Sequence, residues 1–409
     1  MRVLFTTVPE RTIFQYLVPV AWALRTAGHD VRFAVQPKFA DVVTQAGLTA
    51  QPVGGDRDLW RVADMFPEQR EAERIGLPVP YDAAGDPARA TRETMLAGYR
   101  EAVADWHRMT NFPMIADLVA FAREWRPDLV IWEPLTFAGS IAAKACGAAH
   151  ARLLYSLDVF GVTRELFLKA GSGEDPLAEW LGSYARKYGG EYSEDMAVGQ
   201  FTIDQFPASL TLRSELPTLR TQYIPYGGAA VVPKWLWAEP EKPRVALTMG
   251  LSATDHYSGY SISLQDVFDA LADLDVELVA TVAGDHALKV PDNTRVVSYV
   301  PLHALAPTCR AVIHHAGLAT LATVSRFGVP QLAIPLHFDQ PALARNLAAQ
   351  GAGIDLPNDA ATGQSVRDAV VRLLTEPSFA DRAAALQREM ERLPTPNELV
   401  PEIEARAGR

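Results

Sequence analysis

The first half of the chain alternates short apolar runs with segments of helical pattern. The apolar, β-rich runs predict strands, and the segments between them predict helices that end at residues such as Gly28 and Gly47. The predicted strands are Val3–Thr7, Val31–Val35, Leu48–Val53, Leu129–Trp132 and Ala151–Tyr155, and the predicted helices are Leu17–Thr26, Lys38–Ala46, Ile115–Trp125 and Ser140–Cys146. This alternation is typical of a parallel sheet with helices on both faces.

Two segments interrupt the alternation. Residues 54–112 are rich in charge, Pro and Trp, and we expect a long irregular insertion there, which in a compact domain is more often functional than decorative. Residues 216–243 are dense in Pro, Gly and aromatic residues and have no period, so they predict an interdomain linker. Residues 1–215 are therefore expected to form a first domain.

The alternation resumes after the linker and predicts a second domain over residues 244–392. Its expected strands are Val245–Met249, Glu277–Val282, Thr294–Tyr299, Ala311–His314 and Gln331–Ile334. Helices are expected between the strands, and they include Leu318–Phe327 and Pro341–Gln350. Residues 393–409 predict a Pro-broken helix that packs back on the first domain. The expected fold class is α/β, with two doubly wound domains that face each other across a cleft.

Ligands of doubly wound sheets bind beyond the carboxyl ends of the strands. Three predicted strands of the second domain have their carboxyl ends at this cleft. One end carries His314, His315 and Gly317 before a helix, a second carries Gly250 and Ser252, and the third carries the sequence SYVPLHAL. A helix N-terminus presents unpaired N–H groups and the positive end of a dipole, so the first joint suits an anion. The alternative is a histidine that caps a helix in an ordinary domain.

Two further side chains extend this expected anion site. Thr320 and the backbone amides of residues 318–320 could hold phosphate oxygens while His315 donates from the side. Asp339 stands at a predicted helix N-cap, where it is expected to cap the helix and could also reach sugar hydroxyls through a free oxygen.

Composition narrows the class of protein. The 409 residues, 48% of them hydrophobic, indicate two domains, and a net charge of -11 with a pI near 5.4 leaves no basic excess for nucleic acid. No apolar run approaches the roughly 18–20 residues of a membrane span, and the N-terminus has no secretory signal, so we expect a cytoplasmic protein without membrane insertion. Cys146 and Cys309 are expected to be free thiols, with no zinc-binding spacing and no P-loop.

Several stretches together resemble the actinobacterial antibiotic glycosyltransferases, in particular the macrolide and anthracycline branch with the erythromycin mycarosyl- and desosaminyltransferases. The stretches are MRVLFTTV, LVPVAWALRTAGHDVRFAVQP, WRPDLVIWEPLTFAGSIAAKACGAAHARLL, YSEDMAVGQFTIDQFPASL and VPLHALAPTCRAVIHHAGLATLATVSRFGVPQLAIP. The resemblance runs nearly end to end. It implies a GT-B fold and an inverting, metal-independent transfer, without a cofactor, of a deoxysugar from a dTDP-sugar to a polyketide-type or other hydrophobic aglycone.

The resemblance also implies roles for particular residues and partners. His315 corresponds to a pyrophosphate contact, Val300 and Pro301 to the segment on the thymine, and Asp339 and Gln340 to the pair that faces the donor sugar. The complete donor set is Gly250, Ser252, Val300, Pro301, His315, Gly317, Leu318, Thr320, Asp339 and Gln340. The partner that it implies is a cytochrome P450-like activator protein. A homodimer stays open, because the sequence does not set the oligomeric state.

The chain departs from the family pattern in two places. The family usually has Gly at the positions of Ala316 and Ala319, and Ser or Ala at the position of Leu318. The larger side chains of this sequence are therefore expected to crowd the phosphate loop. Ile13 stands where many relatives carry a histidine that acts as general base, and Ile13 and Phe14 become candidate acceptor contacts. Isoleucine takes no proton, although a well-placed base is worth roughly 10²–10⁴-fold in rate.

Two carboxylates are candidates for the missing base, Asp158 and Glu133, because each follows a predicted strand and burial could raise its pKa. The alternative for each is a helix-capping or loop carboxylate, and the nearby Glu10 and Arg11 are expected to be solvated. An acidic base would also suit a carbon nucleophile or an amide or indole nitrogen, so O-, C- and N-glycosylation all stay open.

Aromatic side chains of the insertion and the linker would suit a large apolar acceptor, although ordinary packing accounts for many of them. They are Trp60, Phe66, Tyr81, Trp106, Trp235 and Trp237. Two other functions remain open from the residues alone: a non-catalytic homologue that binds donor or partner, as Ile13 and the altered loop suggest, and a sugar-nucleotide epimerase of the same architecture.

Overall fold

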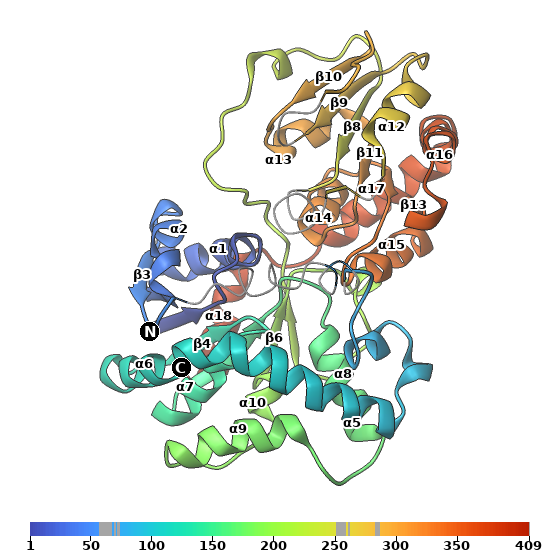
Figure 1. Cartoon of the computed structure of the whole chain (residues 1–409). Helices are drawn as coiled ribbons and strands as arrows, with labels where there is room; N and C mark the ends of the chain where they lie inside the picture. The colour runs from blue at the N-terminus through green and yellow to red at the C-terminus, as the bar shows by residue number, and fades with distance from the viewer. Residues whose placement is uncertain are drawn as a thin grey trace.

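The computed structural model describes residues 1–56, 68, 71, 74–250, 259–260, 262–282 and 287–408. Figure 1 shows two α/β units, each built on one parallel sheet with helices packed around it. Within the described residues the first sheet has the strand order β3-β2-β1-β4-β5-β6-β7, and the second has the order β10-β9-β8-β11-β12-β13. Both are the doubly wound arrangement that the alternation predicted.

The first sheet and its helices come from the N-terminal half of the chain. The strands are Arg2–Thr6 (β1), Asp30–Val35 (β2), Thr49–Pro52 (β3), Leu129–Trp132 (β4), Ala149–Leu153 (β5), Phe201–Asp204 (β6) and Thr218–Arg220 (β7). The α-helices are Arg11–Thr26 (α1), Ala40–Gln45 (α2), Arg92–Glu101 (α5), Arg108–Trp125 (α6), Ala138–Cys146 (α7), Val159–Lys169 (α8), Pro176–Lys187 (α9) and Asp195–Val198 (α10). Shorter turns are Pro37–Phe39 (η1), Tyr81–Ala84 (η2), Pro87–Arg89 (η3), the π-helix Ala102–His107 (η4) and Ala208–Leu210 (η5).

The second sheet and its helices come from the C-terminal half. The strands are Arg244–Thr248 (β8), Glu277–Thr281 (β9), Thr294–Val297 (β10), Cys309–His314 (β11), Gln331–Ala333 (β12) and Gly353–Asp355 (β13). The α-helices are Leu264–Leu271 (α12), Leu302–Leu305 (α13), Leu318–Arg326 (α14), Gln340–Ala349 (α15), Gly363–Thr375 (α16), Pro377–Glu391 (α17) and Pro396–Arg406 (α18). Lys234–Leu236 (η6), Ala306–Thr308 (η7) and Asn358–Ala360 (η8) form 3-10 turns.

Two predicted segments differ from the structure. The expected linker begins as a strand, because β7 extends the first sheet beside β6, and the connection between the sheets starts only after Arg220. The expected irregular insertion ends in regular structure, since α5, the π-helix η4 and α6 follow one another from Arg92 to Trp125. One buried face along this run, with Met95, Tyr99 and Val103 among its members, covers the sheet. Charge and proline had obscured that face in the sequence.

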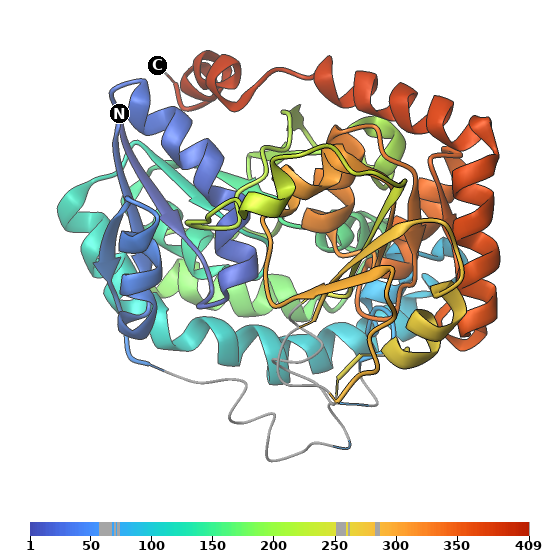
Figure 2. The ribbon, with the colours of Figure 1, turned by 90° about the horizontal axis from the view of Figure 1, so that it is seen from above.

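The last helix returns to the first domain, as Figure 2 shows for the segment that ends at the C-terminus. Helix α18 packs against α1, and Leu399, Val400 and Ile403 are buried there. A capping box between Thr395 and Glu398 starts the helix, and Pro401 lies inside it without ending it. This contact, together with α14 and α15, joins the two domains through one apolar cluster.

Candidate functional site

The carboxyl ends of β8 and β11 bring the predicted phosphate residues together. The two strands are adjacent and parallel, with Thr248 paired to His314, so the segments that follow them meet. The His315 ring lies between Gly250 and Gly317: a Cβ on Gly250 would lie 2.6 Å from Cε1 of His315, and a Cβ on Gly317 would overlap Nε2. Glycine at both positions is what lets the imidazole occupy this place.

The two adjacent histidines have different roles in this turn. His314 is fully buried, accepts from the amide of Ala316 at 2.9 Å through Nδ1 and contacts Oε1 of Gln331 at 2.8 Å through Nε2. These bonds secure the turn, in which Ala316 has a left-handed φ of 61°. His314 is therefore a structural histidine, and burial lowers its pKa to about 3.

His315 is the histidine that can serve a ligand. Burial lowers its pKa to about 4, so the imidazole is neutral at pH 7, and its Nδ1 has no hydrogen-bond partner within the described part of the chain. It adjoins the start of α14, whose N-cap Gly317 has no side chain to satisfy the first amides. Leu318 is buried and Thr320 half-buried in the first turn. A neutral imidazole beside a helix N-terminus that its own N-cap leaves uncapped suits an anion.

Of the remaining residues predicted to bind the donor, the structure describes Val300 and Pro301 but not Ser252. Val300 and Pro301 follow β10 and are both buried, with Pro301 at the N-cap of α13. Val300 joins an apolar cluster with Leu305 and Leu236. Ser252 lies outside the described residues.

Asp339 does not do what its position predicted. It stands at the N-cap of α15, yet its side chain makes no capping hydrogen bond. Instead its Oδ2 accepts hydrogen bonds from the Ser156 hydroxyl and from the Leu157 amide at 3.3 Å, both in the first domain just after β5. Burial raises the pKa of this carboxyl. Gln340 braces the same loop, because its Oε1 accepts from the amides of Leu336 at 3.2 Å and His337 at 3.0 Å.

The two candidate base residues are both engaged by the protein. Asp158 pairs through both oxygens with the buried Arg152, at 2.8 and 2.6 Å, and also accepts from the Gly161 amide as the N-cap of α8. Glu133 has no exposed surface, and it accepts from the Val8 amide at 3.1 Å, the Leu135 amide at 2.7 Å and the Thr136 hydroxyl. Burial raises the pKa of Glu133 to about 7. These contacts weigh against direct proton transfer by either residue.

The predicted acceptor contacts Ile13 and Phe14 lie in helix α1 rather than in a loop. Phe14 is 1% exposed, and its ring packs edge-on against Phe33 and Phe39 at 5.3 and 5.7 Å. Phe14 is therefore a core residue and its assignment as an acceptor contact is wrong. Ile13 is also buried, in the first turn of α1 after the N-cap Glu10.

Aromatic rings of the two domains meet beside Asp339. Phe338, which precedes Asp339, lies 6.5 Å from the ring of Trp106 and 6.3 Å from that of Phe160. Tyr81 adjoins both first-domain rings, at 5.8 and 4.6 Å. Phe338 has a φ of 48°, a strained conformation for an aromatic residue.

Of the other predicted aromatic residues, none joins this group in the described structure. Trp235 instead lies under the guanidinium groups of Arg244 and Arg295, and Trp237 is 72% exposed. Trp60 and Phe66 lie outside the described residues.

Sequence reasoning missed Ser156, Phe338 and Tyr16. Ser156 lies only two residues before Asp158, in the loop that the sequence had singled out, but a serine beside an aspartate gives no local signal. Tyr16 is buried on α1, and burial raises its pKa, with the charge of Asp339 as a further cause. The backbone amide of Ala319 lowers that pKa, which puts the Tyr16 hydroxyl at the start of α14.

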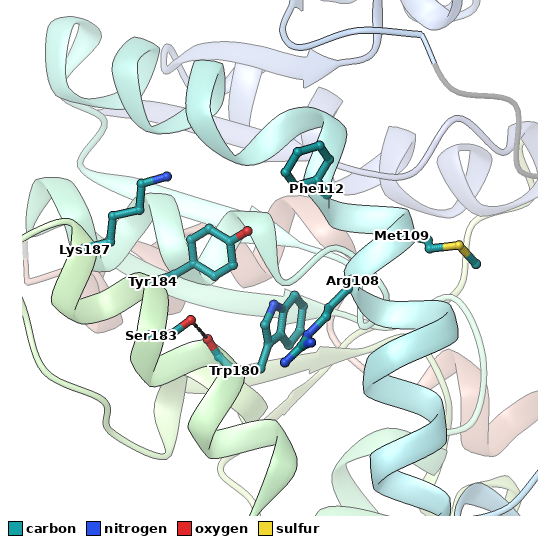
Figure 3. Close-up of a pocket in the computed structure, with 7 residues that line it drawn as sticks. All are labelled: Arg108, Met109, Phe112, Trp180, Ser183, Tyr184 and Lys187. Atoms are coloured by element: carbon teal, nitrogen blue, oxygen red, sulfur yellow. Dashed lines mark hydrogen bonds between the residues drawn. The ribbon is translucent and has the colours of Figure 1, made fainter.

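A separate hollow lies on the outer side of the first domain, between α6 and α9 (Figure 3). It has a volume of about 500 Å³ and is lined by Arg108, Met109, Phe112, Trp180, Ser183, Tyr184 and Lys187. None of these residues belongs to the strand-end site. Elsewhere in the described residues Cys146 and Cys309 are free thiols, and no helix among them is long and apolar enough to cross a membrane.

The fold and the site define a class of protein. Two facing doubly wound domains, with a helix terminus suited to an anion in the second and aromatic rings of both domains in contact, form the GT-B architecture, and the chain is a glycosyltransferase.

The chain belongs to the erythromycin biosynthesis protein CIII-like family, whose N-terminal domain matches residues 22–250 and whose C-terminal domain matches residues 265–406. It is 44% identical to the 10-deoxymethynolide desosaminyltransferase of Streptomyces venezuelae, over 100% of this chain and 98% of that protein. It is 42% identical to the aclacinomycin-T 2-deoxy-L-fucose transferase of Streptomyces galilaeus, over 99% and 96%. The crystal structure of glycosyltransferase VinC in complex with dTDP is 36% identical, covers 100% of both chains and superposes with a TM-score of 0.88.

Proposed function

We propose that this glycosyltransferase transfers a deoxysugar from a dTDP-sugar to a polyketide-type or other hydrophobic aglycone, with inversion and without a metal. One observation carries the proposal: the neutral His315 imidazole is set between Gly250 and Gly317 at the start of α14, where a diphosphate would meet both the ring and the N-terminus of the helix. The named activities of the relatives and the dTDP in the VinC structure support the sugar class and the nucleotide.

In the proposed reaction the acceptor nucleophile attacks the anomeric carbon while the bond to dTDP breaks. His315 and the first amides of α14 would stabilise the charge that develops on the departing diphosphate. Val300 and Pro301 would support the thymine, and Asp339 with Gln340 would hold the sugar. The wall of Trp106, Phe160 and Phe338 would line the acceptor side.

The acceptor proton needs a separate account, because Ile13 cannot take it. The contacts of Asp158 assign it to the ion pair with Arg152 and to the start of α8. The contacts of Glu133 assign it to holding Val8, which lies in the segment between β1 and α1. We infer that both act on structure and that the nucleophile gives its proton to water or to the departing diphosphate rather than to either carboxylate. An acidic acceptor such as a phenol would need the least help.

The proposal is tested first by the binding of dTDP and then by the formation of a glycosylated product. Calorimetric titration of dTDP into wild type should show saturable binding, and His315→Ala should weaken it by about 10-fold, as expected for one lost hydrogen bond to a charged group. Mass spectrometry should then detect a glycosylated product from a panel of dTDP-deoxysugars and polyketide aglycones. The panel is run with EDTA and with and without a P450-like activator, and the linkage of the product distinguishes O-, C- and N-transfer.

The second candidate function is a non-catalytic homologue, which Ile13 at the usual base position favours. Intact dTDP binding with no product under any of these conditions would support it. Absence of both dTDP binding and product would overturn the transferase proposal, and conversion of the donor without an acceptor would favour an epimerase.

A further inference from the structure

The carboxylate that is proposed to face the donor sugar is held by the opposite domain. Asp339 belongs to the second domain, and its Oδ2 accepts from the Ser156 hydroxyl and the Leu157 amide of the first. We propose that Ser156 is a positioning residue for the donor sugar: it turns Asp339 toward the sugar and makes that orientation depend on closure of the two domains. This inference rests on the proposed function.

The Asp339 side chain is oriented by its bonds to the first domain. An aspartate at a helix N-cap ordinarily accepts from the amides of its own helix. In α15 no such amide is offered, because Pro341 has no N–H and the Ala342 amide donates to the Asp339 carbonyl at 3.0 Å. Asp339 makes no such bond. Both interdomain bonds end on Oδ2, so neither of them uses Oδ1, which is the oxygen that we propose to meet a sugar hydroxyl. The Leu157 bond is long at 3.3 Å, which leaves the Ser156 hydroxyl as the principal partner.

The loop around Asp339 is fixed independently of Ser156. Gln340 binds the amides of Leu336 and His337, and Phe338 packs on Trp106 and Phe160. The Gly76 amide also donates to the Leu336 carbonyl at 2.9 Å. Removing the Ser156 hydroxyl should therefore leave the loop in place and free only the carboxylate. We expect it to lose the fixed orientation that the Ser156 hydroxyl gives it.

A second interdomain serine provides a matched control. The Ser209 hydroxyl donates to Oε2 of Glu389 on α17 at 2.6 Å, which is the same chemistry across the same two domains. Ser209 lies near the far end of α15, because Gln350 donates to its carbonyl. Ser209→Ala therefore removes an equivalent bond without touching the sugar site.

The experiment compares Ser156→Ala, Ser156→Thr and Ser209→Ala with wild type. The readouts are the dissociation constant of dTDP, kcat and KM for the dTDP-deoxysugar that wild type turns over, and Tm. For Ser156→Ala we expect kcat/KM to fall by about 10-fold while dTDP, which lacks the sugar, binds as in wild type. Ser156→Thr, which keeps the hydroxyl, should recover most of kcat/KM, and Ser209→Ala should leave both donor parameters unchanged.

Three results would overturn the inference. One is an unchanged kcat/KM in Ser156→Ala. Another is an equal loss of affinity for dTDP and for the sugar donor, which would indicate a general structural role. The third is a gain in donor affinity, which would mean that Ser156 competes with the sugar for Asp339. Failure of the proposed function looks different, because wild type itself would then form no product, whether or not it binds dTDP.

Discussion

Position 317 requires glycine because of the imidazole ring beside it, and not because of its backbone conformation. Its φ is an ordinary -60°, so no left-handed conformation requires glycine there. A Cβ at this position, however, would overlap Nε2 of His315. The neighbouring residue 316 shows the opposite case, since an alanine there tolerates a φ of 61° that glycine would adopt more easily.

Gly317→Ala should displace the His315 imidazole and weaken dTDP binding by about 10-fold or more, the effect of losing a hydrogen bond to a charged group. Calorimetric titration of dTDP measures this. Gly55→Ala is the matched control, since a Cβ at Gly55 has no atom within 4 Å. An unchanged dissociation constant in Gly317→Ala would show that His315 does not contact the diphosphate.

Glu133 should make stability depend on pH. Burial raises its pKa from 4.5 to about 7, so the folded protein binds this proton more tightly than the unfolded chain does. The resulting stabilisation is fully present below pH 4.5 and is lost as pH rises through 7, a change of about 3 kcal/mol. Urea denaturation across this range should show a larger fall in wild type than in Glu133→Gln, in which Asp204, whose pKa burial also raises to about 7, still titrates.

The same substitution at the surface, Glu402→Gln, controls for the loss of one acidic group, because Glu402 is 56% exposed. A wild-type profile that runs parallel to that of Glu133→Gln would mean that the three hydrogen bonds to Glu133 keep its pKa near the ordinary value.

At the scale of elements, the ion pair between Arg152 and Asp158 links strand β5 to the start of helix α8. Arg152 lies in β5 with no exposed side-chain surface, and Asp158 both neutralises it and caps the helix. Arg152 also donates to the Thr202 hydroxyl in β6 at 2.7 Å, so the strand, its neighbour and the following helix share one polar group. This is why a carboxylate that looked catalytic in the sequence is better explained as part of the scaffold.

Asp158→Asn should lower the free energy of unfolding by about 3–5 kcal/mol, because it keeps a capping oxygen but leaves the buried Arg152 without its counter-charge. Thermal and urea denaturation measure the change. Thr91→Ala, which removes only the N-cap of α5, should lower it by about 1 kcal/mol. Equal effects of the two substitutions, together with loss of product in Asp158→Asn, would restore Asp158 as a candidate base.

At the scale of the whole molecule, the chain closes on itself through α18. The helix belongs by sequence to the C-terminal end, yet its apolar face packs on α1 of the first domain. His29, whose Nε2 lies 3.0 Å from Glu404, adds a polar contact at the same interface. The two domains are thus held by a covalent connection at residues 221–243 and by this returning helix.

Ile403→Ala should lower the free energy of unfolding by about 2–4 kcal/mol, because Ile403 is fully buried between α18 and the first domain. The dissociation constant of dTDP for the folded protein should not change, since the helix lies away from α14 (Figure 1). Urea denaturation and calorimetry measure the two effects. A destabilisation below about 1 kcal/mol would show that α18 adds little to the first domain.

The sequence by itself determined the order of elements, the two parallel sheets, the return of the last helix and the His315–Gly317 joint at a strand end. These follow from apolar periodicity and from glycine next to a strand, which are local signals. It did not reveal the short strands β6, β7 and β13, whose three or four residues carry too little pattern.

The tertiary structure alone decided which residues of each loop face one another. Periodicity could not say that Phe14 turns into the core, that Asp158 is taken by Arg152, or that Asp339 reaches Ser156 instead of its own helix. The partners of such polar groups are chosen by burial, because a buried carboxylate must find donors wherever the packed domains place them. For Asp339 those donors lie in the other domain, so no local sequence pattern records them.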